Sequence, residues 1–328
     1  MIERTLNLTD PGVNKTMNNK PWTEAQMPAM TGKTAIVTGA NSGIGYETAR
    51  ALAHKGATVI MACRNLAKAN DAATQIRNTK PAGAIDVMLL DLGDLESVRR
   101  FATEFRTRCA RLDLLVNNAG IMTPPFGQTA QGFESQFGTN HLGHFALTGL
   151  LLDLLLQTST SRVVTVSSVA HRYGKIDFDN LNWAHGYDRS RAYGQSKLAN
   201  LLFTHELQRR LTAAGAKTLA VAAHPGWTET NLQAHSGFYN FLNPLLAQKS
   251  PMGALPTLYA ATAADVLGGG YYGPSGFLEV RGYPQKVSSN DRSHDKAVAG
   301  RLWSVSEELT GVVYPFAQAT RNAVLGVA

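Results

Sequence analysis

Short apolar runs alternate with longer helix-like segments along most of this 328-residue chain. The apolar runs are nearly continuous in hydrophobic residues, which is typical of strands buried on both faces of a parallel sheet. The segments between them are long enough for the helix that returns the chain to the starting edge of the sheet. Strands are expected over residues 34–40, 57–63, 85–92, 112–120, 162–168 and 218–226. Helices are expected over residues 43–55, 66–78, 95–108, 131–157 and about 190–211.

This alternation predicts an α/β fold, a single doubly wound parallel sheet (a Rossmann fold) with helices on both faces. Ligands of such a sheet bind beyond the carboxyl ends of its strands. We expect one domain over residues 31–328, with a lid around residues 227–250. Residues 1–30 are expected to form a weakly ordered arm with a short helix near Trp22. A last strand after residue 268 and a helix near residues 293–309 complete the prediction.

The composition excludes several classes of function. Hydrophobic residues make up 44% of the chain, enough for a core, and the net charge is +7. The basic residues are scattered, so we expect no nucleic-acid partner. Cys63 and Cys109 lack metal-ligand or CxxC spacing and are expected to be reduced packing residues of a cytoplasmic protein. The apolar stretch at residues 144–156 falls short of the about 20 residues of a membrane span and contains Asp153, so we expect no span.

A glycine-rich turn, TGANSGIG at residues 38–45, lies between the first expected strand and the first expected helix. Its GxxxGxG spacing differs from the usual fingerprint, but the strand–turn–helix context is the one that a dinucleotide requires. Gly39 permits a tight turn, and Gly43 and Gly45 let the backbone approach a pyrophosphate and the helix pack on the sheet. A glycine turn without a ligand is the alternative. The expected cofactor contacts here are Gly39, Asn41, Ser42, Gly43, Ile44 and Gly45.

The end of the second expected strand distinguishes between two dinucleotides. NAD sites usually carry an acidic residue there, which binds the ribose 2′-hydroxyl. This strand ends instead in MACRN, with Arg64 and Asn65 about twenty residues after the glycines and Lys68 close by. A guanidinium can pair with a 2′-phosphate, so the pattern favours NADP(H) over NAD(H). A surface arginine at a helix start is the alternative.

Two further strand ends fit the same ligand. Asp91 and Leu92 end the third strand, where the carboxylate can accept a hydrogen bond from an adenine amino group. Asn118, Ala119 and Gly120 end the fourth strand, where a turn of small residues can pass close to the adenosine ribose. A polar turn explains each of these features alone, but explains the set poorly. All five residues are therefore expected cofactor contacts.

Tyr193 and Lys197, one helical turn apart, are the candidate catalytic residues. Ser168 lies 25 residues before the tyrosine. The i to i+4 spacing puts the phenol and the ammonium on one helix face. The cation favours the phenolate, so it lowers the tyrosine pKa toward the working range of a general acid or base. With a dinucleotide nearby, this set predicts hydride transfer to or from a carbonyl.

These motifs together resemble the short-chain dehydrogenase/reductase family. TGANSGIG, LDL at residues 90–92, NNAG, the serine strand, YGQSK and HPGWTET occur in that family's order and spacing, over about residues 32–310. The finer resemblance is to the branch with retinol dehydrogenase-like enzymes and, more distantly, protochlorophyllide reductase. ACRN, GIM, TNHLGHF, VSSVAHRYGKIDFDNL and SKLANLLF carry it.

The resemblance implies roles residue by residue. Tyr193 matches the catalytic acid or base, and Lys197 matches the lysine that lowers the tyrosine pKa and binds the nicotinamide ribose. Ser168 matches the serine that binds the substrate oxygen, with Ser167 as the alternative. Asn140 matches the asparagine that holds a water in a proton relay through Lys197. Contacts to the nicotinamide end or a phosphate are expected from Pro225, Gly226, Thr228 and Thr230. No metal is implied, and His141, His144, His171 and His224 are expected to be structural or supporting residues.

Two stretches are expected to form the substrate pocket. One is residues 122–133, and the other runs from Trp227 through an apolar cluster toward Pro251. The cluster consists of Phe238, Tyr239, Phe241 and Leu242. An aromatic lid of this kind would exclude water, which favours a hydrophobic carbonyl or alcohol such as a retinoid, a steroid, a long-chain aldehyde or a polyketide-like ketone. Aromatic residues that merely cover the edge of the core are the alternative.

Two further questions stay open at this point. A non-catalytic regulator that senses NADP(H) on the same fold is the alternative function, although relatives that lost activity typically lose the tyrosine, the lysine or the glycine turn. In the family, the helices near residues 131–157 and 190–211 often pair subunits, so a homodimer or homotetramer is expected. A monomer is the alternative.

Overall fold

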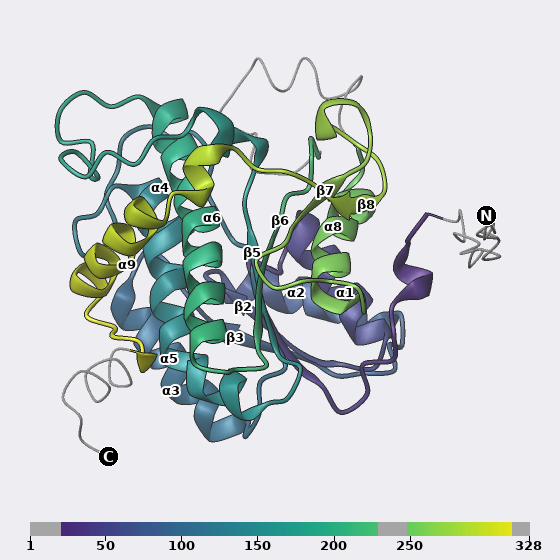
Figure 1. Ribbon diagram of the computed structural model, residues 1–328. Coiled ribbons are helices and arrows are strands. Elements are labelled where there is room, and N and C mark those ends of the chain that lie inside the picture. The colour runs from purple at the N-terminus through teal and green to yellow at the C-terminus, as the bar shows by residue number, and fades with distance from the viewer. Residues whose placement is uncertain (1–20, 229–247, 317–328) are drawn as a thin grey trace, which may run out of the picture.

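The computed structural model describes residues 21–228 and 248–316, and within them one eight-stranded sheet forms the centre (Figure 1). The strand order is β3-β2-β1-β4-β5-β6-β7-β8. Every neighbouring pair is parallel except β7 and β8. The strands are β1 (Thr34–Thr38), β2 (Thr58–Cys63), β3 (Ile85–Leu89), β4 (Leu114–Asn117), β5 (Arg162–Val166), β6 (Leu219–Ala223), β7 (Tyr271–Pro274) and β8 (Pro284–Lys286). The doubly wound α/β fold is confirmed.

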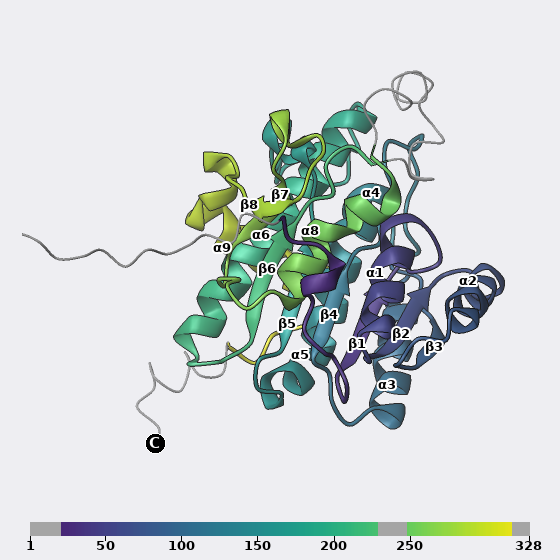
Figure 2. The same cartoon turned by 90° about the vertical axis from the view of Figure 1, so that its right-hand side faces the viewer.

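Helices cover both faces of the sheet. The long ones are α1 (Gly43–His54), α2 (Leu66–Asn78), α3 (Leu95–Arg108), α5 (Gly143–Gln157), α6 (Arg189–Ala213), α8 (Ser250–Thr262) and α9 (Lys296–Thr310). Adjacent side chains of a strand point to opposite faces, and Ile36 and Val37 of β1 accordingly belong to different core clusters. Ile36 packs in the cluster with α3, α5, α6 and α9, and Val37 in the cluster with α1, α2 and α8. Figure 2 shows the face that α1 and α8 cover.

Five of the six expected strands are shorter than expected at their carboxyl ends, whereas β2 ends at Cys63 as predicted. β1 ends at Thr38 and β4 at Asn117, so the glycine turn and most of the NNAG motif lie outside the sheet. Register brings these ends together, because Thr38 pairs with Ala62 of β2 and Val37 with Val116 of β4. The motifs that the sequence places on different strands therefore meet at one edge.

The C-terminal third differs most from the prediction. The final strand pair, β7 and β8, is an antiparallel hairpin rather than one added strand. Helix α8 was not predicted, because the expected lid ends around residue 250 and no element was expected from there to residue 268. Pro251 lies in the first turn, where a missing N–H leaves no bond unmade, and the helix also accommodates Pro256.

Helix α9 packs over α5 and α6 (Figure 1). The ring of Trp303 lies 5.1 Å from that of Phe145 and 5.9 Å from that of Phe203, measured between centroids. Just after α9, the Tyr314 hydroxyl donates to the Phe145 carbonyl oxygen at 2.7 Å. The apolar stretch of α5 is therefore buried partly by the end of the same chain.

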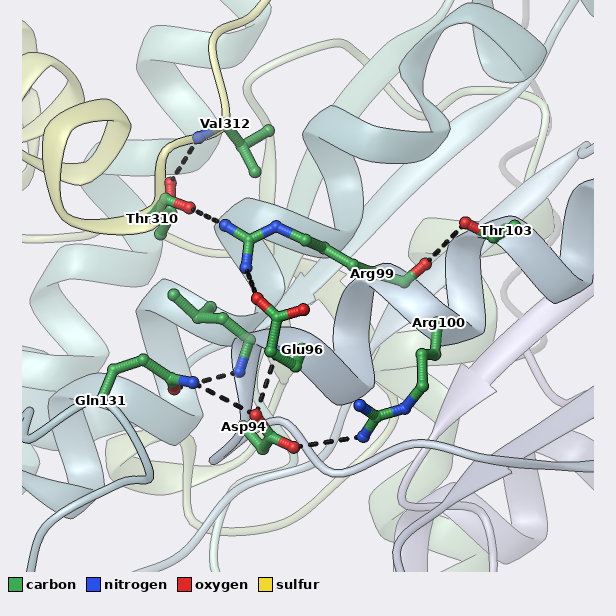
Figure 3. A network of polar contacts seen from close by, with 9 residues as sticks. Asp94, Glu96, Arg99, Arg100, Thr103, Gln131, Thr310 and Val312 are labelled. Carbon is green, nitrogen blue, oxygen red and sulfur yellow. Dashed lines mark hydrogen bonds and ion pairs between the residues drawn. The ribbon is translucent and has the colours of Figure 1, made fainter.

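A polar network fixes α3 beside the end of α9, as Figure 3 shows. Asp94 caps α3 by accepting from the Glu96 N–H at 3.0 Å, and it also accepts from the Gln131 side chain at 3.2 Å. Arg99 contacts Glu96 and donates to the Thr310 carbonyl oxygen at 2.7 Å. Because that carbonyl is at the C-terminus of α9, the arginine satisfies a group that the helix leaves without a partner.

Residues 21–30, which the sequence assigns to a weakly ordered arm, are packed on the domain. They contain the expected short helix, η1 (Glu24–Gln26). The ring of Trp22 lies edge-on to that of Tyr259 at 5.1 Å, and Glu24 pairs with Arg50 at 2.7 Å. Packing therefore starts before the boundary expected at residue 30. Among the described helices, none is long and apolar enough to cross a membrane.

Candidate functional site

A cavity of about 600 Å³ lies at the carboxyl ends of the strands, where the fold places its ligands. Every expected cofactor contact within the described residues lines it. These are Gly39, Asn41, Ser42, Gly43, Ile44, Gly45, Arg64, Asn65, Asp91, Leu92, Asn118, Ala119, Gly120, Tyr193, Lys197, Pro225, Gly226 and Thr228. Thr230 and the aromatic cluster expected in the lid lie outside the described residues.

The glycine turn has a backbone that side chains would not permit. Gly39 and Gly43 have φ values of 66° and 56°, in the left-handed region. A Cβ on Gly45 would lie 2.4 Å from the Gly39 carbonyl oxygen and 2.5 Å from Nδ2 of Asn118. The turn thus closes on itself and on the end of β4, and Gly45 serves this packing. The resulting backbone cradle at the start of α1 fits a pyrophosphate, because helix N-termini favour anions.

The turn after β4 is attached to the end of β1. The side chain of Asn118 donates to the Thr38 carbonyl oxygen at 2.8 Å, and the backbone N–H groups of Asn118 and Ala119 both donate to the Thr38 hydroxyl oxygen at 2.9 Å. Three hydrogen bonds therefore fix the NNAG turn against the glycine turn.

The far end of the cavity contains the residues expected to recognise a 2′-phosphate and an adenine. Within the described residues, the exposed Arg64 makes no hydrogen bond or ion pair, so its guanidinium remains available to an anion. Asn65 caps α2 by accepting from the Lys68 N–H at 3.0 Å. One carboxylate oxygen of Asp91 accepts from the Gly93 N–H at 2.9 Å and so stabilises the turn after β3.

Tyr193 and Lys197 lie on the same face of α6, and both line the cavity. The Nζ atom of Lys197 is 5.6 Å from the centroid of the Tyr193 ring. It donates to the Val166 carbonyl oxygen at 3.2 Å, and burial lowers the pKa of the lysine to about 8. A buried ammonium beside a phenol stabilises the phenolate, which matches the chemistry inferred from the spacing.

The two serines after β5 have different surroundings. The buried Ser167 donates its hydroxyl to the Lys197 carbonyl oxygen at 2.8 Å. The half-buried Ser168 accepts from the Ala170 N–H at 3.2 Å, which leaves its own hydroxyl hydrogen for another partner. Of the pair, Ser168 is thus better placed to donate to a substrate oxygen in the cavity.

Asn140 is fully buried and does not line the cavity. It lies in a π-helical turn, η2 (Gly138–Leu142), just before α5. Its side chain accepts from the Ile121 N–H at 2.8 Å and donates to the Ile121 carbonyl oxygen at 3.0 Å and to the Ser196 hydroxyl at 3.0 Å. The side chain therefore holds the chain beyond Gly120, between the cavity and α5.

The four histidines near the motifs are buried, and burial lowers the pKa of each. His141 has a pKa of about 3, and those of His144 and His171 are about 4. All of them are therefore neutral near pH 7. Within the described residues, no three His, Cys, Asp or Glu side chains gather in a way that would hold a metal ion.

Sequence reasoning missed part of the cavity wall. Residues of a short 3-10 helix after Ser168 and of the β7–β8 hairpin also line the cavity, and they are Val169, Ala170, Tyr173, Leu278, Glu279 and Val280. Leu278 and Glu279 have positive φ values of 53° and 58° without being glycines. Such conformations cluster at functional sites. The GFLE stretch matches no turn signature, so the sequence does not predict the positive φ values of Leu278 and Glu279.

Glu279 connects the missed segment to the rest of the site. One carboxylate oxygen lies 2.8 Å from the Arg172 guanidinium, and the other lies 2.9 Å from Nε2 of His224. Burial works to raise the pKa of Glu279, but His224 and Arg172 outweigh it and hold that pKa below its ordinary value. The hairpin tip is thus attached to the segment that carries Ser168.

The chain is similar to known sequences over most of its length. The family model described as short chain dehydrogenase matches residues 33–237. Retinol dehydrogenase 13 of Homo sapiens is 43% identical over 296 residues, which cover 87% of this chain and 86% of that protein. Retinol dehydrogenase 12 of Mus musculus is 41% identical over 313 residues, which cover 94% of this chain and 95% of that protein.

Solved structures share the fold of this chain. An uncharacterised protein from Mycobacterium paratuberculosis has a TM-score of 0.77 and 48% identity, and the match covers 90% of this chain and all of that one. The Pseudomonas aeruginosa RhlG/NADP active-site complex has a TM-score of 0.59 and 26% identity, over 74% of this chain and 94% of that one.

Proposed function

This chain belongs to the short-chain dehydrogenase/reductase family and is an alcohol or carbonyl oxidoreductase, and we propose that it uses NADP(H) and acts on a hydrophobic carbonyl or alcohol. One observation carries the proposal. Tyr193, Lys197 and Ser168 line the same end of a cavity whose other end has Arg64 beside the glycine turn. A reacting carbonyl at the first end and a phosphorylated dinucleotide along the second fit this arrangement.

The residues divide the chemistry among them. The Tyr193 hydroxyl gives its proton to the substrate oxygen in reduction, and its phenolate takes the alcohol proton in oxidation. The Ser168 hydroxyl donates to the same oxygen and stabilises the charge that develops on it. The Lys197 ammonium lowers the pKa of the tyrosine and holds a ribose hydroxyl. When bound, NADPH would supply the hydride for reduction.

Arg64 supports the choice of NADP(H). A 2′-phosphate carries about two negative charges and accepts paired hydrogen bonds from a guanidinium. No acidic residue takes the place at the end of β2 where a ribose diol would be bound. Two structural neighbours, the RhlG complex and a Shigella flexneri dehydrogenase, are described as bound to NADP, which agrees with this preference.

Apolar side chains around the reacting end support a hydrophobic substrate. Ile121, Met122, Val169 and Leu278 line the cavity there, together with the half-exposed ring of Tyr173. The names of the sequence relatives, retinol dehydrogenases 12 and 13, point to substrates of the same chemical character. A lid around residues 227–250 remains part of the proposal, and most of it lies outside the described residues.

The assembly and the location of the enzyme are also proposals. Helix α9 covers part of α5 and α6, the helices expected to pair subunits. This packing favours the monomer over the homodimer or homotetramer, and sedimentation of the purified protein would test it. The cytoplasmic location stays a prediction from the sequence.

The first experiment is a turnover assay with NADPH and with NADH, across aldehydes and ketones from small polar to long apolar. The decrease in nicotinamide absorbance measures the rate. Faster turnover with NADPH and with apolar carbonyls is expected. Equal rates with the two nucleotides would contradict the role of Arg64, and a preference for polar carbonyls would contradict the hydrophobic pocket.

A further inference from the structure

A buried histidine, His144, connects two parts of the site that the proposed reaction uses. It lies in the first turn of α5 with 1% of its surface exposed. Its Nδ1 atom is 3.0 Å from the Asn140 carbonyl oxygen, and its Nε2 atom is 2.9 Å from the Thr38 hydroxyl oxygen. One imidazole therefore bridges the π-helical turn before α5 and the end of β1.

The hydrogen-bond partners determine the tautomer of this imidazole. A carbonyl oxygen only accepts, so Nδ1 of His144 carries the hydrogen and donates it to Asn140. Burial lowers the pKa of His144 to about 4, so the ring is neutral near pH 7 and Nε2 accepts. The Thr38 hydroxyl has two acceptors within reach, Nε2 at 2.9 Å and the Val116 carbonyl oxygen at 3.3 Å, and the shorter contact is a donation to Nε2. This direction suits the threonine, because its oxygen already accepts the N–H groups of Asn118 and Ala119.

The two residues that His144 joins hold opposite ends of one segment. Residues 118–121, the exit segment of β4, run along the cavity wall. Thr38 holds the start of this segment through three hydrogen bonds, and Asn140 holds its end through both backbone groups of Ile121. The segment also lies close to the catalytic lysine, because a Cβ on Gly120 would be 3.5 Å from Nζ of Lys197.

We propose that His144 is a positioning residue, which fixes the exit segment of β4 between the glycine turn and Lys197 by holding Thr38 and Asn140 at a set separation. This proposal rests on the proposed function, because it assigns the separation to nucleotide binding and hydride transfer. The Thr38 side of the bridge acts on the cradle for the nucleotide. The Asn140 side acts on the backbone beside Lys197 and thus on the catalytic end.

Two amide substitutions test the contacts of His144 with Asn140 and with Thr38 separately. The amide of asparagine reaches about as far as Nδ1, so His144→Asn retains the donor to Asn140 and loses the contact with Thr38. The longer glutamine amide reaches about as far as Nε2, so His144→Gln retains the contact with Thr38 and loses Asn140. His144→Phe loses both contacts and keeps a ring of similar size.

The matched control is His141, three residues earlier. It is also buried, and its pKa of about 3 makes it neutral near pH 7. Its Nε2 atom lies 2.9 Å from the Ser306 hydroxyl of α9, and its ring lies 6.1 Å from that of Phe145, measured between centroids. His141→Asn, whose amide reaches only as far as Nδ1, therefore removes the Nε2 contact of a buried histidine in the same helical segment that faces away from the exit segment.

The test measures NADPH dissociation constants by calorimetry, kcat, and thermal unfolding for the full-length variants. His144→Asn is expected to weaken NADPH binding about tenfold with little change in kcat, since one buried hydrogen bond contributes about that factor. His144→Gln is expected to lower kcat about tenfold with little change in binding. His144→Phe should show both losses. His141→Asn should lower the unfolding temperature and leave binding and kcat within about twofold.

Equal behaviour of the His144 and His141 variants, with lower unfolding temperatures and unchanged binding and kcat, would overturn the proposal and leave His144 a packing residue. The proposal would also be overturned if His144→Asn and His144→Gln had the same NADPH dissociation constant and the same kcat. Failure of the proposed function looks different, because the unaltered protein would then bind NADPH without turning over any carbonyl. The binding measurements would still test the Thr38 side in that case.

Discussion

The two ends of the cavity are built in different ways. The nucleotide end consists mostly of backbone, since turns after β1 and β4 close on each other through Thr38 and Asn118. The reacting end consists of side chains from segments far apart in the sequence, such as Met122, Tyr173 and Leu278. A backbone cradle requires particular residues at fixed spacing, whereas an apolar wall requires only volume and hydrophobicity. The sequence therefore predicts the nucleotide end, whereas at the reacting end it predicts the catalytic residues but not the apolar wall around them.

The largest effect expected at either end is that of Tyr193→Phe. The ring remains and only the proton donor is lost, so turnover should fall about a thousandfold or more while NADPH binding changes little. Steady-state rates and calorimetry on the same preparation measure the two quantities. Tyr283→Phe, on a tyrosine that does not line the cavity, is the control. Substantial turnover by Tyr193→Phe would contradict the mechanism.

Arg64→Ala tests the nucleotide end, where a side chain rather than the backbone gives specificity. Loss of a charge-assisted pair with the 2′-phosphate should weaken NADPH about tenfold to a hundredfold and leave NADH nearly unchanged. The ratio of the two dissociation constants is the measurement. The exposed Arg281, which does not line the cavity, provides the control as Arg281→Ala. Equal weakening of both nucleotides would show that Arg64 does not read the phosphate.

Gly45→Ala sharpens the comparison by adding one methyl group to the backbone cradle. The new Cβ would lie 2.4 Å from the Gly39 carbonyl oxygen, so the turn must shift, and we expect a loss of about 1–3 kcal/mol in unfolding free energy together with weaker NADPH binding. In contrast, a Cβ on Gly300 of α9 meets nothing within 4 Å. Gly300→Ala should therefore stabilise the protein by up to about 1 kcal/mol. Denaturant titrations measure the unfolding free energy of both variants. A Gly45→Ala variant with unchanged unfolding free energy and unchanged NADPH binding would contradict the backbone cradle.

Leu278→Ser addresses the reacting end and should have the smallest effect. The leucine is 63% exposed yet lines the cavity, so only part of its surface can meet a substrate. We expect KM to rise about threefold for long-chain aldehydes and to stay constant for short ones, because only a long chain reaches the hairpin tip. Leu267→Ser, at a leucine that is 60% exposed and away from the cavity, is the control. A KM that changes equally for all chain lengths would remove Leu278 from the pocket.

The sequence predicts those parts of the molecule that depend on local rules. Tyr193 and Lys197 share a helix face because of their spacing, and α2 and α3 have the expected bounds because cap residues and apolar periodicity mark them. Parallel pairing brings the strand-end motifs together whatever lies between them. These rules account for the doubly wound parallel sheet with helices on both faces and for the nucleotide end of the cavity.

The remainder depends on contacts between distant segments. Asn140 holds Ile121 rather than facing the cavity, which only the packing of α5 against β4 reveals. The positive φ values of Leu278 and Glu279 are set by the hairpin around them and by partners on other elements, as in the ion pair with Arg172. No element was expected at helix α8, whose two prolines disfavour a helix in isolation, and its packing against α1 outweighs that preference.

The position of α9 has a consequence for how the protein is made. Its contacts reach back more than half the length of the chain, from Thr310 to Arg99 and from Tyr314 to Phe145. During synthesis the ribosome therefore releases α3, α5 and α6 before the segment that covers them exists. Phe145 and Phe203 are therefore synthesised well before their later partners Trp303 and, for Phe145, Tyr314. This half of the core closes only after α9 leaves the exit tunnel.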